Sequence, residues 1–191
     1  MDDATSAAYE QASGYFVGLV EHVGGSEWTS PGLGEWNVLE LVAHTNRAHT
    51  LVESYLVHPQ PAAGPEYFAE SAIAQRARDA VDALGDAPVA TVRRDAERAL
   101  AVIAASPADA VIGSPMGSMA LSAYLPSRSA ELVIHGLDLA RALTLPVAPP
   151  ADAIIAALEW VGAVASRRKV AVDLLLAATG RAALPPGFSV Y

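Results

Sequence analysis

Residues 130–143, AELVIHGLDLARAL, place Glu131, His135 and Asp138 among aliphatic side chains. Positions three and four apart lie on one face of an α-helix, so this spacing predicts a helix with a single polar stripe. The other faces of the helix are apolar, which is typical of a buried helix, and the stripe is therefore expected to point inward. Burying an unpaired polar group costs about 2–7 kcal/mol, and a charge costs more, so the stripe needs a partner.

A second segment, EWNVLELVAHT at residues 35–45, sets His44 in the same kind of position. A divalent metal ion between the two segments would satisfy His44, Glu131 and His135 together. Three protein ligands leave one tetrahedral position open, as in catalytic zinc sites. Zinc is the expected ion, and the same donors suit nickel, cobalt or ferrous iron. The stripe that contains His44 is otherwise apolar or aromatic, with Leu41, Ala48, Leu51 and Tyr55 at helical spacing.

Each of these residues also has an ordinary structural interpretation. A glutamate four residues before a histidine is a common pair on helix surfaces, and a lone buried histidine is usually a hydrogen-bonded core residue. Asp138 either orients a ligand ring or pairs with Arg141. Glu40 is expected to cap a helix, with an outer contact to the ring of His44 as the alternative. The remaining histidines are expected to be solvated: His22, His49 and His58.

Composition favours a single all-α domain over residues 1–191, with a flexible tail from about residue 180 to residue 191. The chain is 52% hydrophobic and only 17% charged, the reverse of the balance found in disordered proteins. Its apolar residues repeat at helical spacing. There is no cysteine, so any sulfur chemistry must use an external thiol.

The charge balance excludes some partners. The 12 basic and 21 acidic side chains give a net charge of −9, which repels phosphate backbones and anionic membranes, so neither nucleic acid nor a membrane is expected as a partner. The N-terminus, MDDATSAAYE, lacks the order of a signal peptide, and no apolar run is long enough to span a membrane. A cytoplasmic protein is predicted, and a homodimer remains open.

Helical periodicity and turn residues divide the chain into five helical regions. The second begins at Asn37, a favourable N-cap with Glu40 three residues later. The turn-rich segment 106–126 is interpreted as a long loop, with a contribution to a pocket mouth as the alternative. The expected regions are 4–23, 37–57, 66–105 with a break at 84–88, 127–144 and 151–178.

Both motifs have a family resemblance. GLGEWNVLELVAHTNRA resembles the tryptophan-led helix of the mycothiol-dependent maleylpyruvate isomerase metal-binding family, a branch of the DinB-like bundles. AELVIHGLDLARAL resembles the second motif of that family, E-x-x-x-H-G-x-D-x-A. The order and separation of the motifs also agree, and the resemblance extends from about residue 5 to about residue 181.

The resemblance implies a DinB-like four-helix bundle with up-down-down-up connectivity and additional short helices. It places the metal ligands of the family on His44, Glu131 and His135, and it implies a metal-dependent S-transferase or related enzyme that uses a low-molecular-weight thiol such as mycothiol and a small electrophile. The isomerase itself has a further C-terminal domain, for which residues up to Tyr191 leave no room, so maleylpyruvate is not carried over as the substrate. The alternative is a non-catalytic metal-binding or structural bundle.

Overall fold

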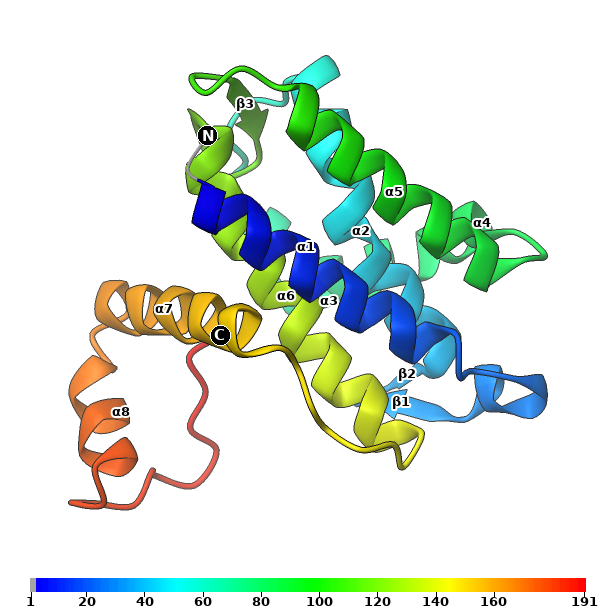
Figure 1. Ribbon diagram of the computed structural model, residues 1–191. Helices are drawn as coiled ribbons and strands as arrows, with labels where there is room; N and C mark the ends of the chain where they lie inside the picture. The colour runs from blue at the N-terminus through cyan, green and yellow to red at the C-terminus, as the bar shows by residue number, and fades with distance from the viewer. Residues whose placement is uncertain (1–2) are drawn as a thin grey trace.

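The computed structural model describes residues 3–191. Four long helices form a bundle in which α1 contacts α5 and α6, and α2 contacts the same two helices. Helices α1 and α6 run in one direction and α2 and α5 in the other, which is up-down-down-up connectivity (Figure 1). The predicted all-α, DinB-like four-helix bundle is confirmed. The bundle helices are α1 (Asp3–Val20), α2 (Val38–Val57), α5 (Pro88–Ala105) and α6 (Leu121–Ala142).

Short elements connect the bundle helices, and two further helices follow them. Two antiparallel hairpins contain all the strands of the described residues. The long crossover between the parallel helices α2 and α5 carries two of the additional short helices. The connecting elements are η1 (Gly25–Thr29), β1 (Pro31–Leu33), β2 (Trp36–Asn37), η2 (Pro65–Phe68), α3 (Glu70–Asp79), α4 (Val81–Leu84), β3 (Val111–Ser114) and β4 (Gly117–Ala120), and the chain continues with α7 (Ala151–Arg167) and α8 (Ala171–Ala178).

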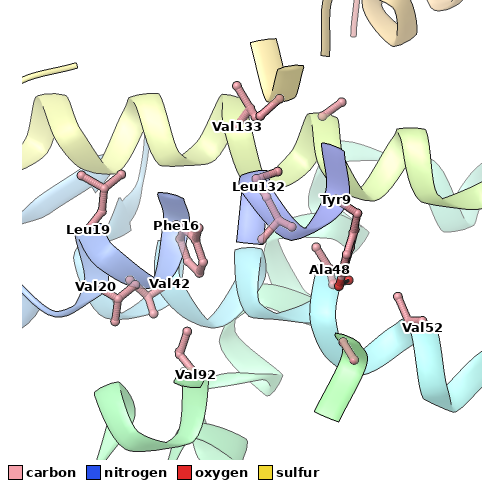
Figure 2. Close-up of a cluster of buried hydrophobic side chains, with 14 of the residues drawn as sticks. Tyr9, Phe16, Leu19, Val20, Val42, Ala48, Val52, Val92, Leu132 and Val133 are labelled. Atoms are coloured by element: carbon pink, nitrogen blue, oxygen red, sulfur yellow. Dashed lines mark hydrogen bonds between the residues drawn. The ribbon is translucent and has the colours of Figure 1, made fainter. Parts of the chain in front are cut away.

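The hydrophobic core lies between the four bundle helices. Figure 2 shows side chains from α1, α2, α5 and α6 meeting there. The phenol of Tyr9 reaches across the core and donates a 3.1 Å hydrogen bond to the carbonyl oxygen of Ala48, which satisfies its buried hydroxyl. Apolar side chains at three- and four-residue steps on each helix therefore form one continuous core: Phe16, Leu19, Val20, Val42, Val52, Val92, Leu132 and Val133.

Helix α2 begins with the predicted capping box. The side chain of Asn37 accepts a 2.9 Å hydrogen bond from the backbone N–H of Glu40, and the carboxylate of Glu40 accepts one of 2.9 Å from the N–H of Asn37. Such a cap contributes about 1 kcal/mol. It fixes the start of the helix that carries His44.

The start of α6 differs from the sequence-based boundary. The helix begins at Leu121 and runs through Pro126, whereas the sequence predicts a start at residue 127. Pro126 is the sixth residue of the helix, where it removes one backbone hydrogen bond, but its helical φ lets the helix continue. The preceding segment is the β3–β4 hairpin and not a plain loop. Gly113 lets this hairpin pack closely on the chain after α2, because a Cβ there would lie 2.7 Å from Cβ of Pro59.

The region after α6 also departs from expectation. The predicted single helical region 151–178 is two helices, because Lys169 adopts a left-handed conformation with φ of 62°. Helix α7 packs on α1 and α6, and the last residues return toward α7 without regular structure (Figure 1). Among the described helices, none combines the length and the apolar character that a membrane span requires. The single domain and the flexible tail remain predictions.

Candidate metal centre

The structure brings His44 from α2 together with Glu131 and His135 from α6. Nε2 of His44 lies 3.6 Å from Oε2 of Glu131, and Nε2 of His135 lies 3.4 Å from the same oxygen. One potential ligand atom from each residue lies within 4.8 Å of the others. Two imidazole nitrogens and one carboxylate oxygen at such separations could hold a divalent metal ion.

Close packing of α1 against α6 supports this arrangement. A Cβ at Gly136, the residue after His135, would lie 2.6 Å from Cε1 of Tyr15. Glycine is therefore required for α1 to approach the helix face beside the site. In the H-G pair of the second motif, His135 is therefore a candidate ligand and Gly136 allows the close contact between α1 and α6.

Two neighbours orient the histidine rings. Oδ2 of Asp138 lies 3.1 Å from Nδ1 of His135, so it accepts the Nδ1–H hydrogen bond and leaves Nε2 facing Glu131. Metal-binding histidines commonly have such a carboxylate partner. The ring of Trp36 lies against that of His44, with centroids 4.7 Å apart and planes inclined by 35°. Nδ1 of His44 is buried without a hydrogen-bond partner among the described residues.

Burial and mutual contacts shift the pKa of each member of the group. Burial lowers the pKa of His44, which keeps this ring neutral as a ligand must be. Although burial opposes it, hydrogen bonds from the two histidines hold the pKa of Glu131 well below its usual range. Burial also opposes the charge on His135, but hydrogen bonds to Asp138 and Glu131 raise its pKa to about 9.

These states fit a metal site. Glu131 is ionised and His44 is neutral, as ligands must be, and His135 carries a proton that a metal ion would displace. The donor set contains no sulfur and suits zinc, nickel, cobalt or ferrous iron. The chemistry of the residues present is therefore compatible with a divalent ion.

The group lies in a pocket of about 620 Å³. Besides α2 and α6, the pocket is lined by η2 and α3, by β1 and β2, by the β3–β4 turn and by the end of the chain. The turn contributes Ser114, Pro115 and Met116, so segment 106–126 helps to form the pocket, and its interpretation as a plain loop is wrong. Ser189 and Tyr191 line the pocket from the predicted tail.

Glu40 forms the predicted cap, and Nε of Arg78 lies 3.7 Å from its carboxylate. Among the described residues no hydrogen bond or ion pair joins Glu40 to His44, so the alternative contact is not seen. The assignment of His49 requires correction. His49 is fully buried and not solvated. It faces Ser13 and Asn46 on the opposite side of α2, because that side packs against α1 and α5. His22 and His58 are exposed, as predicted.

Sequence reasoning missed three arginines that line the pocket, Arg47, Arg76 and Arg128. The spacing could have indicated two of them. Arg47 follows His44 by three residues and Arg128 precedes Glu131 by three, so each shares a helix face with a candidate ligand. Without the pocket, such arginines are indistinguishable from solvated surface charges.

The comparison with protein families decides the assignment of the chain. A family model described as the mycothiol maleylpyruvate isomerase N-terminal domain matches residues 9–140, more than half of the sequence. The chain belongs to this family. The matched residues contain the whole first motif and the E-x-x-x-H-G-x-D-x-A pattern of the second. They end before α7 and α8, short of the span to residue 181 expected from the sequence. Neither the curated proteins nor the solved structures gave a match.

Proposed function

We propose that the protein binds one divalent metal ion through His44, Glu131 and His135 and transfers a low-molecular-weight thiol of the mycothiol type to a small electrophile. The observation that carries this proposal is the convergence of three ligand atoms within 4.8 Å in a pocket, in a chain of the isomerase N-terminal domain family. Zinc is the proposed native ion, with nickel as the alternative.

Neighbouring side chains would orient the two histidine ligands toward the ion. Asp138 holds the proton on Nδ1 of His135 and so directs Nε2 toward the site. Trp36 packs on the ring of His44 and limits its rotation. When bound, a divalent ion would supply a Lewis acid that favours the thiolate form of an incoming thiol.

The thiol and the electrophile would share the pocket. A volume of about 620 Å³ lies in the range typical of small-molecule sites. Since the chain contains no cysteine, the sulfur would come from the bound thiol.

Cobalt substitution tests this function. Sulfur coordination to cobalt gives a charge-transfer absorption that nitrogen and oxygen ligands do not give, and no protein thiol interferes. Titration of the cobalt protein with mycothiol should produce this band. Glu131→Gln should weaken or abolish it, because a neutral amide is a poor ligand, and Glu159→Gln, an exposed glutamate on α7, is the matched control.

A non-catalytic metal-binding role is the second candidate. It requires no more than the three convergent ligand atoms, which metal binding alone would explain. A protein that binds cobalt but shows no sulfur band with mycothiol or with simpler thiols would refute thiol transfer and support this second role.

A further inference from the structure

Each helix that carries a candidate metal ligand also carries an arginine one turn away. Arg47 lies on α2 three residues after His44, and Arg128 lies on α6 three residues before Glu131. Both arginines line the pocket that contains the histidine–glutamate group. A third arginine of the lining, Arg76, already donates a 2.7 Å hydrogen bond to a backbone carbonyl oxygen in η2.

Arg128 is held in place by a hydroxyl group and an aromatic ring, and the charge of Glu131 acts on it without forming an ion pair. Its Nε donates a 3.1 Å hydrogen bond to Oγ of Ser127, and its guanidinium carbon lies 5.0 Å from the centroid of the Tyr124 ring. Within residues 4–191 it forms no ion pair, and its terminal amino groups have no hydrogen-bond partner. The side chain is part-buried. A fixed guanidinium with free terminal amino groups matches the two oxygens of a carboxylate.

Arg47 is also part-buried, and it forms neither a hydrogen bond nor an ion pair with the described residues. The charges of Arg47 and Arg128 both act on the phenol of Tyr124. Burial raises the pKa of Tyr124, and the charges of Arg128 and Arg47 both act against this rise. The two guanidinium groups therefore act on one region of the pocket.

The three carboxylates that line the pocket are engaged with the histidines or exposed. Glu131 interacts with both histidines, and Asp138 accepts the hydrogen bond from His135. Glu70, which also lines the pocket, is exposed at the start of α3. An incompletely solvated guanidinium without an anion carries a free-energy cost, which a ligand anion would remove.

We infer that Arg47 and Arg128 form a carboxylate-binding subsite beside the candidate metal centre. Arginine pairs recognise carboxylates through charge-assisted hydrogen bonds. The rest of the pocket selects for an apolar body on the same molecule, because its walls include Leu51, Phe68, Ile73, Met116 and Ile134. The ligand class is a small carboxylic acid with an aliphatic or aromatic body.

The subsite implies that the electrophile of the proposed function is a carboxylic acid. This part of the inference rests on the proposed function. Binding of the carboxylate does not require the ion, so the subsite can be tested separately. In the cobalt protein, a sulfur band from 2-mercaptoethanol that persists in saturating hexanoate supports simultaneous binding of a thiol and a carboxylate. Loss of the band would overturn the assignment of the subsite to the electrophile.

The direct test is an NMR titration of the full chain in EDTA, with ¹⁵N-labelled protein and two probes, hexanoate and its neutral analogue hexanamide. Hexanoate should bind at least about tenfold more tightly, because charge-assisted hydrogen bonds are the stronger ones. Arg128→Gln and Arg47→Gln should each weaken hexanoate binding by about tenfold or more. Arg141→Gln, an exposed arginine on α6 outside the pocket, is the matched control and should not change it.

Equal affinity for the two probes would overturn the subsite, as would unchanged hexanoate binding in a folded Arg128→Gln protein. Should Arg128→Gln fail to fold, Arg47→Gln carries the same test. Arg128→Lys keeps the charge without the planar fork, so it should bind hexanoate more weakly than the wild type. Hexanoate binding without a cobalt–sulfur band would refute thiol transfer and leave the subsite standing, and the converse result would refute the subsite only.

Discussion

His49 should make the stability of the fold depend on pH in a way that one substitution removes. Nδ2 of Asn46 donates a 2.8 Å hydrogen bond to Asp95. The amide oxygen of Asn46 therefore faces Nδ1 of His49, 3.0 Å away, and accepts the Nδ1–H hydrogen bond. Nε2 then accepts the hydroxyl hydrogen bond of Ser13 at 3.0 Å. This chain of hydrogen bonds satisfies one neutral tautomer, and a second proton on Nε2 would require the Ser13 hydroxyl to turn and accept it.

Burial lowers the pKa of His49 from 6.5 to about 4. Between these values the unfolded chain binds the proton and the folded chain does not, so the contribution is fully present above pH 6.5 and is lost as the pH falls toward 4. The shift corresponds to about 3 kcal/mol in total and to about 2.5 kcal/mol by pH 4.5.

The perturbation is His49→Gln, which keeps a donor and an acceptor but does not titrate. Urea unfolding in EDTA at pH 7 and pH 4.5 should show that the free-energy difference between the wild type and the variant shrinks by about 2.5 kcal/mol at the lower pH. His58→Gln removes an exposed imidazole and serves as the control. A difference that stays constant within about 0.5 kcal/mol would refute the description of His49 as a buried neutral ring.

Three further predictions concern the metal. His135→Ala should abolish tight binding of about one ion per chain, because two protein ligands remain, and full occupancy by elemental analysis would contradict the ligand set. Chelation should leave the helical circular dichroism intact but lower the melting temperature, since the core is apolar and the ion binds the native state; loss of the helical signal would instead indicate a structural site. The pKa of about 9 for His135 means that metal binding releases a proton from this ring. The apparent metal affinity in a chelator competition should therefore rise about tenfold per pH unit between pH 6 and 8. A flat pH profile would contradict that protonation state.

Local sequence patterns predicted the helices and the polar face of each. Glu131 and His135 are four residues apart, so a helix alone places them on one face, and the capping box at Asn37 sets the start of the helix of His44. The resemblance then paired the two helices, which spacing within either motif cannot do. Identification of this group therefore needed both local periodicity and family information.

The rest of the pocket depends on contacts between distant segments. The β3–β4 turn lines it together with η2, and neither has a periodic pattern that points to a site. The prediction that His49 is solvated is wrong because the neighbouring Thr45 and Asn46 give its helix face a polar sequence pattern. That face is buried, and its polar groups are satisfied by partners such as Ser13 and Asp95, from other helices.

The contact between Trp36 and His44 provides an intrinsic optical reporter. The indole lies 4.7 Å from the His44 ring and 6.5 Å from that of His135, so its excited state would be quenched by cobalt or nickel and spared by zinc. The other tryptophans, Trp28 and Trp160, lie in η1 and α7. Replacing both with phenylalanine would leave an emission signal from Trp36, and metal exchange could then be followed in real time without an added dye.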